Sequence, residues 1–291
     1  MSDLEAPPLR RPWSFVIDAY RLAYVTVPKA ACTTLQWLVA ELSGEDLSGA
    51  TAQPHAAASR RQLVHQRRLW QHTPGLDALS ADRRGAMTRG SGWLTFAVVR
   101  DPRARLWSAW QSKLLLRLPR YVTAYQDEPW FPRVPTETAH VVEDFATFAR
   151  AYEAGAVGAL MDDSHFRPQA EILAGVDVPE LELYDLSRLD ELMADIGSHL
   201  ATYGREMPDL ARENSTPLPL TSEVLADGVQ ERIERCYAAD FERYGSLWPA
   251  VPRTRDAATW TRTAFDDIAM RIEMHERLGD LAKMARRARR R

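Results

Sequence analysis

The sequence predicts an α/β fold with a central parallel sheet flanked by helices in three layers. Residues 22–27 (LAYVTV) and 94–99 (LTFAVV) are short and almost entirely apolar, which is typical of parallel strands buried on both faces. Helical patterns separate these runs along the chain. With 291 residues, 45% of them hydrophobic, the chain is long enough to bury a substantial core.

The remaining elements follow from periodicity and from turn residues. Residues 180–185 alternate between apolar and polar and predict a third strand, and residues 14–18 are a weaker strand candidate. The stretches 44–62 and 119–137 read as irregular segments, the first small and polar, the second rich in proline and aromatics. The predicted helices cover residues 33–42, 103–117, 140–154, 187–203, 221–243 and about 257 to the end.

Charge and cysteine content narrow the class of protein. The formal net charge is −3, so the chain lacks the overall positive field of a nucleic-acid coating protein. Its two cysteines, Cys32 and Cys236, are too few for a disulfide framework and suit a reducing compartment. The N-terminus lacks an apolar signal core, and no apolar run reaches the length of a membrane span. We therefore expect a soluble cytoplasmic protein.

The first distinctive turn is VPKAACTT, between the strand at 22–27 and the next helix. Unpaired N–H groups at a helix N-terminus favour an anion, Lys29 adds a positive charge, and Thr33 and Thr34 add hydroxyl donors. Ala30 and Ala31 are small enough for a phosphate to approach the backbone without glycine dihedrals. The turn lacks the glycines of a Walker loop. An ordinary strand-to-helix turn with an exposed lysine explains this fragment equally well.

The second distinctive turn lies in FAVVRDPRARLWSAWQSK, residues 96–113. Asp101 is a good N-cap and Pro102 a good first helical residue, which leaves Arg100 at the mouth of the strand. Its guanidinium is suited to bidentate phosphate binding, and Ser108 lies two helical turns further on. Alternatively, Arg100 pairs with a carboxylate and Ser108 faces solvent. Both turns follow strands and are suited to bind an anion, so together they favour a shared anionic ligand.

Both turns resemble sulfotransferase motifs. Val27-Pro28-Lys29 followed by Cys32-Thr33-Thr34 is similar to the 5′-phosphosulfate loop, and Val99-Arg100-Asp101-Pro102 with Ser108 is similar to the 3′-phosphate motif. Order and spacing resemble the sulfotransferase family 2 branch, which contains many carbohydrate sulfotransferases and bacterial relatives. The resemblance spans roughly residues 20 to 248 and includes weaker landmarks: HFRPQ at 165–169, ENST at 213–216 and YAADFERYG at 237–245.

The resemblance implies a three-layer, P-loop-like sulfotransferase fold and a metal-independent reaction. The co-substrate would be 3′-phosphoadenosine 5′-phosphosulfate (PAPS), and the acceptor a hydroxyl. Lys29 would neutralise charge on the bridging oxygen, while Arg100 and Ser108 would hold the 3′-phosphate. The 5′-phosphosulfate would contact Pro28, Lys29, Ala30, Ala31, Cys32, Thr33 and Thr34.

A general base must remove the acceptor proton, and the resemblance implies a histidine or glutamate. We rank His65 first, because it lies between the two turns in RRQLVHQRRLW. His72 and His165 follow, although His165 has an alternative role in shaping the donor site. Each of these histidines is also compatible with a purely structural or solvent-facing position.

The C-terminal part reads as an addition to the catalytic unit. We expect a sulfotransferase catalytic domain over residues 1–252 and an amphipathic basic helix over 253–291. The basic end, KMARRARRR, has three interpretations: a solvated terminus, a homodimer contact, or attachment to an acidic surface. The predicted apolar stripe contains Phe265, Ile268, Ile272, Leu278, Leu281 and Ala285.

Two other function classes are compatible with the sequence. One is a nucleotide-dependent kinase, against which stand the missing Walker glycines and the lack of a recognisable magnesium-binding acidic motif. The other is a non-catalytic module that binds nucleic acid or a membrane surface through the basic end; net acidity disfavours nucleic acid. The acceptor class stays open among carbohydrates, glycolipids and secondary metabolites.

Overall fold

The computed structural model describes residues 12–47, 60–209, 216–256 and 260–289. Four strands form one sheet in the order β1-β2-β3-β4, so all four predicted strands are confirmed. β2, β3 and β4 are parallel, while β1 runs antiparallel to β2 because only a short turn joins these two strands. Their bounds are β1 (Ser14–Ile17), β2 (Leu22–Val25), β3 (Leu94–Val99) and β4 (Glu182–Asp185).

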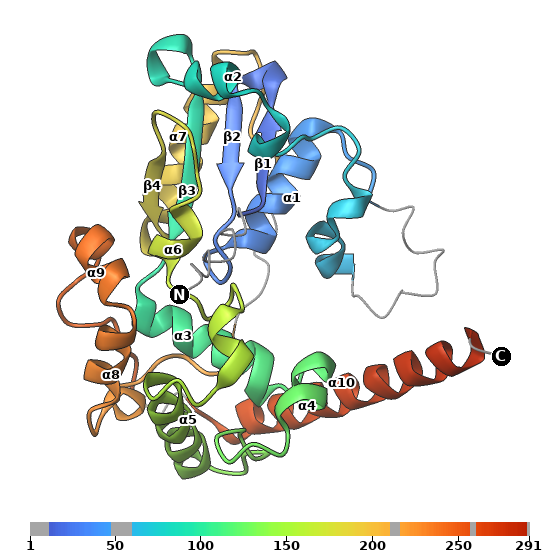
Figure 1. The fold of residues 1–291 in the computed structure, drawn as a ribbon, viewed down its shortest axis with the longest axis vertical. Coiled ribbons are helices and arrows are strands. Elements are labelled where there is room, and N and C mark those ends of the chain that lie inside the picture. The colour runs from blue at the N-terminus through green and yellow to red at the C-terminus, as the bar shows by residue number, and fades with distance from the viewer. Residues whose placement is uncertain (1–11, 48–59, 210–215, 257–259, 290–291) are drawn as a thin grey trace, which may run out of the picture.

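Helices flank this sheet (Figure 1), which confirms the predicted α/β class. Every residue of β1, β2 and β3 is buried, as expected for strands covered on both faces. The sheet shares one hydrophobic core with α1 (Cys32–Ser43) and α7 (Leu189–Ala201). The shorter helices nearby are α2 (Ala81–Gly85), α6 (Gln169–Leu173) and α9 (Ala238–Tyr244).

A second core, to which no strand contributes, lies among the helices beneath the carboxyl end of the sheet in Figure 1. Trp107 stacks on Trp110 at 5.3 Å and on Trp260 at 5.8 Å between ring centroids, which fixes the helix that follows β3 against the C-terminal region. The helices around this core are α3 (Pro102–Trp110), α4 (Pro119–Tyr125), α5 (Thr138–Glu153), α8 (Val229–Cys236) and α10 (Arg262–Arg289).

Three predictions of local structure are wrong. The helix predicted over 221–243 is interrupted, because Asp227 (φ 53°) and Gly228 (φ 78°) adopt left-handed backbone that ends a helix. The segment 119–137 opens with α4, in which Pro119 occupies the first helical turn. Leu281 is 60% exposed and does not share the buried face of Ile268.

Other predictions agree with the structure or lie outside it. Asp101 caps α3 through the N–H of Arg103, and Pro102 is the first helical residue, as predicted. α3 continues into a π-helical segment, Gln111–Leu115 (η7). Most of the stretch 44–62 and of ENST lies outside the described residues. Among the described helices, none is long and apolar enough to cross a membrane.

Candidate active site

The two distinctive turns lie together at the carboxyl ends of the two inner strands of the sheet, β2 and β3. β2 and β3 are adjacent and parallel, so the turns that follow them emerge side by side. The Nη1 of Arg100 donates to the carbonyl oxygen of Lys29 at 3.3 Å. The sequence prediction that these two cationic residues share a site is therefore consistent with their placement.

The first turn has a strained backbone. Lys29 has φ 71° and Ala31 has φ 56°, both in the left-handed region that favours glycine, whereas Ala30 between them does not. Our interpretation that this turn avoids glycine dihedrals is thus wrong. Each such residue costs on the order of 1–3 kcal/mol. Alternation of this kind directs successive N–H groups toward one side and forms a concave anion site.

Helix α1 begins within this turn, at Cys32, and its N-cap residue Ala31 provides no side-chain hydrogen bond. The first N–H groups of a helix have no partner inside the helix, and the helix dipole adds a partial positive charge there. Thr33 is buried in this first turn and Thr34 is half-buried beside it. The start of α1 is therefore suited to bind an anion.

Lys29 lies in a markedly positive environment. Its Nζ donates to Ser112 Oγ at 2.9 Å. Burial and the nearby charge of Lys113 lower the pKa of Lys29 to about 7, and burial likewise lowers the pKa of Lys113 to about 8. Within the described part of the chain, no carboxylate forms an ion pair with either ammonium group. A bound anion would compensate both charges.

His65 reaches the first turn from η3 (Arg60–His65), and its Nε2 lies 3.0 Å from Thr33 Oγ1. Burial and the charges of Lys113 and Lys29 lower the pKa of His65 to about 4. Its imidazole is therefore neutral at pH 7 in the free protein, the form that accepts a proton. The structure thus brings the first-ranked histidine to the predicted donor loop.

The other two histidines differ in their surroundings. His165 Nδ1 lies 2.6 Å from Asp163, and burial followed by the charge of Lys113 lowers the pKa of His165 to about 3. Hydrogen bonds from His165 and Tyr121 overcome the burial of Asp163 and hold the pKa of that carboxyl well below its usual range. His72 is exposed, and its backbone N–H donates to Glu45.

Two hydrogen bonds from one side chain hold the backbone of Arg100. Its backbone N–H donates to Gln169 Oε1 at 2.9 Å, and Gln169 Nε2 donates back to the Arg100 carbonyl at 2.8 Å. The buried Asp240 accepts a further hydrogen bond from Gln169. Burial lowers the pKa of Arg100 to about 10, so the guanidinium stays charged at neutral pH. Ser108 is buried two turns along α3, and no described group hydrogen-bonds its hydroxyl.

Arg105 connects the first turn to the HFRPQ segment. Its fully buried guanidinium donates to the carbonyls of Pro28, Ser164 and Arg167 at 2.8–3.0 Å. The YAADFERYG segment supplies Asp240, which holds Gln169. These weaker landmarks therefore position the two turns through hydrogen bonds.

Sequence reasoning missed four residues of this region: Ser112, Lys113, Asp163 and Asp240. Ser112 lies one helical turn beyond Ser108, so following the same face of the predicted helix would have found it. Asp240 lies within the YAADFERYG landmark, but nothing in that segment indicated its partner, and Asp163 had no local signal, because the partners of both are set by tertiary packing. Among the described residues, no three His, Cys, Asp or Glu side chains lie close enough to hold a metal ion.

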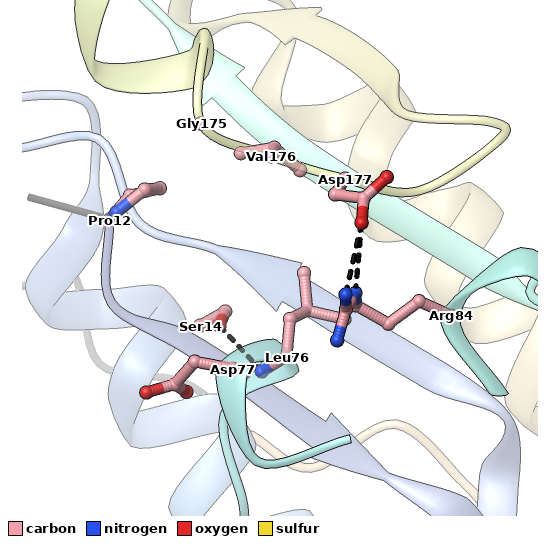
Figure 2. Close-up of a pocket in the computed structure, with 8 residues that line it drawn as sticks. All are labelled: Pro12, Ser14, Leu76, Asp77, Arg84, Gly175, Val176 and Asp177. Carbon is pink, nitrogen blue, oxygen red and sulfur yellow. Dashed lines mark hydrogen bonds and ion pairs between the residues drawn. The ribbon is translucent and has the colours of Figure 1, made fainter. Parts of the chain in front are cut away.

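Two surface hollows lie apart from this site. One lies between β1 and residues 175–177, where Arg84 binds Asp177 at 3.0 Å (Figure 2). The other lies beside α8 and α9 and is lined by Arg103, Phe241 and Trp248, among others. Neither hollow includes Lys29 or Arg100, so the charged groups rather than the hollows define the candidate site.

Comparison with known proteins agrees with this geometry. A family model described as Sulfotransferase family matches residues 13–245, a span that contains both turns and every predicted site residue. The sheet flanked by helices also fits the P-loop-like fold of that family. Neither the curated proteins nor the solved structures gave a match. The matched span is well over half of the chain, and the chain therefore belongs to the sulfotransferase family.

Proposed function

We propose that this protein transfers a sulfuryl group from PAPS to a hydroxyl of a small-molecule or glycan acceptor: a carbohydrate, a glycolipid or a secondary metabolite. The observation that carries the proposal is the meeting of Lys29, the N-terminus of α1 and Arg100 at one edge of the sheet. Two separate cationic sites suit a nucleotide that carries anions at both its 5′ and 3′ positions.

In this reaction the acceptor oxygen bonds to sulfur while the bond between sulfur and the bridging phosphate oxygen breaks. Negative charge then grows on that bridging oxygen, and Lys29 is the group that stabilises it. The backbone and side chains from Pro28 to Thr34 bind the 5′-phosphosulfate, while Arg100 and Ser108 bind the 3′-phosphate. The protein contributes alignment and charge stabilisation, as in phosphoryl transfer.

For the acceptor proton we propose His65 as the general base. Its neutral imidazole and its contact with Thr33 on the donor loop support this role. His165 is the rival, because Asp163 fixes its ring and leaves Nε2 as the available acceptor. The reaction as proposed needs no metal.

We also propose that the protein acts in the cytoplasm, which the two free thiols support. The division into a catalytic unit over 1–252 and an added helix stays a prediction. The end of the family match at residue 245 supports it, while the burial of Ile268 and Ile272 in the second core shows that α10 packs on the catalytic body.

The test is a thermal-shift comparison of three ligands. Adenosine 3′,5′-bisphosphate is expected to stabilise the protein by about 2.7 kcal/mol at one hundred times its Kd. Stabilisation by magnesium-ATP alone would indicate a kinase, and stabilisation by an oligonucleotide alone a nucleic-acid binding module. Transfer of label from radiolabelled PAPS to a cell extract, insensitive to a metal chelator, would then identify the acceptor.

A further inference from the structure

Helix α10 packs on the body through one face only. Ile268 and Ile272 are buried in the second core, and His275 Nδ1 lies 2.5 Å from the carbonyl oxygen of Leu116. Gly279 lies against Pro119 at the start of α4. Beyond this contact the helix runs away from the rest of the molecule (Figure 1).

The opposite face carries large apolar side chains that are exposed. Met270 is 63% exposed, Met274 52%, Leu281 60% and Met284 65%. At 100° per residue, these four positions fall within about 40° of a single line along the helix. That line lies opposite Ile268 and Gly279, so the apolar stripe faces away from the body.

The spacing of this stripe is that of a coiled coil. Successive steps of four and three residues repeat along the stripe, and such a 3.5-residue period keeps one seam facing a partner helix. The positions on the seam are Met270, Met274, Arg277, Leu281, Met284 and Ala288.

The charge of α10 changes sign along its length. Residues 262–276 contain two arginines and four carboxylates, a net charge of −2, whereas residues 277–289 contain five basic residues and one aspartate, a net charge of +4. A parallel pair would place the two +4 segments together. An antiparallel pair places each basic half beside the acidic half of its partner. An anionic membrane would attract only the basic half and repel the acidic half, although the stripe crosses both.

We propose that α10 pairs with α10 of a second copy of this chain as an antiparallel coiled coil centred near Gly279. In this register Met274 packs on Met284 of the second copy, and Leu281 packs beside Arg277. Glu273 then lies beside Arg287, on the same flank of the seam. This assembly is independent of the proposed function.

Size-exclusion chromatography with light scattering tests the assembly. Wild-type protein is expected at twice the 33.0 kDa of one chain, and Met274→Glu with Met284→Glu is expected to elute as a monomer. Ala269→Glu adds charge at an exposed position off the seam and is expected to leave the dimer intact. A monomeric wild-type protein would overturn the proposal, and so would wild-type protein that stays monomeric while binding phosphatidylserine vesicles.

Cysteine cross-linking tests the orientation. Met274→Cys with Met284→Cys is expected to give a covalent dimer under mild oxidation, because the two positions face each other in the antiparallel register. Met274→Cys alone is expected to give no more covalent dimer than the wild type with its native Cys32 and Cys236. A covalent dimer from the single variant would indicate parallel pairing and contradict the proposal.

Discussion

The two turns at the edge of the sheet hold their cations in opposite ways. In the first turn, Lys29 sits on left-handed backbone beside Lys113, and a single hydroxyl, Ser112, accepts its hydrogen bond. In the second turn, Gln169 fixes Arg100 on both sides of its backbone. In the proposed reaction, the first turn offers an uncompensated charge to the reacting end of the donor, whereas the second offers a guanidinium with a fixed backbone to the end that carries the 3′-phosphate. Substitutions in the first turn are expected to change the rate, and those in the second to change the affinity.

The largest expected effect is that of Lys29→Ala. Removing the charge that we propose stabilises the bridging oxygen is expected to lower the rate constant of sulfuryl transfer by about 10³-fold. Single-turnover transfer from radiolabelled PAPS measures this rate constant separately from donor binding. Lys283→Ala, at an exposed position on α10, is the matched control. A Lys29→Ala variant with full transfer rate would show that the first turn does not serve the reaction.

His65→Ala extends the comparison to the residue that touches Thr33. Loss of a general base is expected to lower the rate by about 10²-fold or more. The pH–rate profile is also expected to lose the decline at low pH that protonation of the imidazole causes. His165→Ala is the matched variant and is expected to keep that decline. The reverse pattern would assign the base to His165.

Arg100→Ala is expected to act on affinity. Loss of the guanidinium that we propose binds the 3′-phosphate is expected to weaken binding of adenosine 3′,5′-bisphosphate by about 10²-fold, or about 2.7 kcal/mol. The transfer rate at saturating donor is expected to change far less. Isothermal titration calorimetry measures the affinity. If Arg100→Ala lowered the saturated rate as strongly as Lys29→Ala, the proposed difference between the two turns would be wrong.

The sequence was most informative where local pattern and tertiary role coincide. Buried strands read as β-branched apolar runs, and Asp101-Pro102 marks the start of α3 because capping is a local interaction. The single helix predicted over 221–243 is wrong because local spacing alone suggested it. Val224, Leu225, Val229 and Ile233 keep helical spacing and are all buried, although the chain turns between them at Gly228.

The site contacts that the sequence did not reveal join residues that are far apart in the chain. Lys29 and Ser112 are 83 residues apart, and Arg100 and Gln169 are 69 apart. No local periodicity encodes such pairs. The left-handed backbone at Ala31 was also hidden, because alanine carries no turn signal of the kind that glycine or asparagine provides.

The pH dependence of donor binding is expected to be a smaller effect and to come from the first turn. Anion binding favours the charged lysines, so affinity is full below the free-protein pKa of Lys29, about 7, and falls as pH rises above it. The expected slope is about tenfold per pH unit, and steeper above pH 8, where Lys113 also loses its proton. Titration of adenosine 3′,5′-bisphosphate from pH 6 to 9 measures it. Lys29→Arg, which keeps its charge, is expected to flatten the curve between pH 7 and 8; an unchanged slope would exclude Lys29 as its source.

The smallest expected effect tests the strain in the first turn. Ala31→Gly is expected to raise the free energy of unfolding by about 1 kcal/mol, because glycine adopts φ 56° without a Cβ penalty and is a better N-cap than alanine. Ala30→Gly is the matched control: Ala30 is fully buried and has no left-handed backbone, so the same substitution there is expected to destabilise. Chemical denaturation measures both. If both variants lost stability equally, the backbone at Ala31 would carry no strain, and the first turn would differ from the second only in its charge.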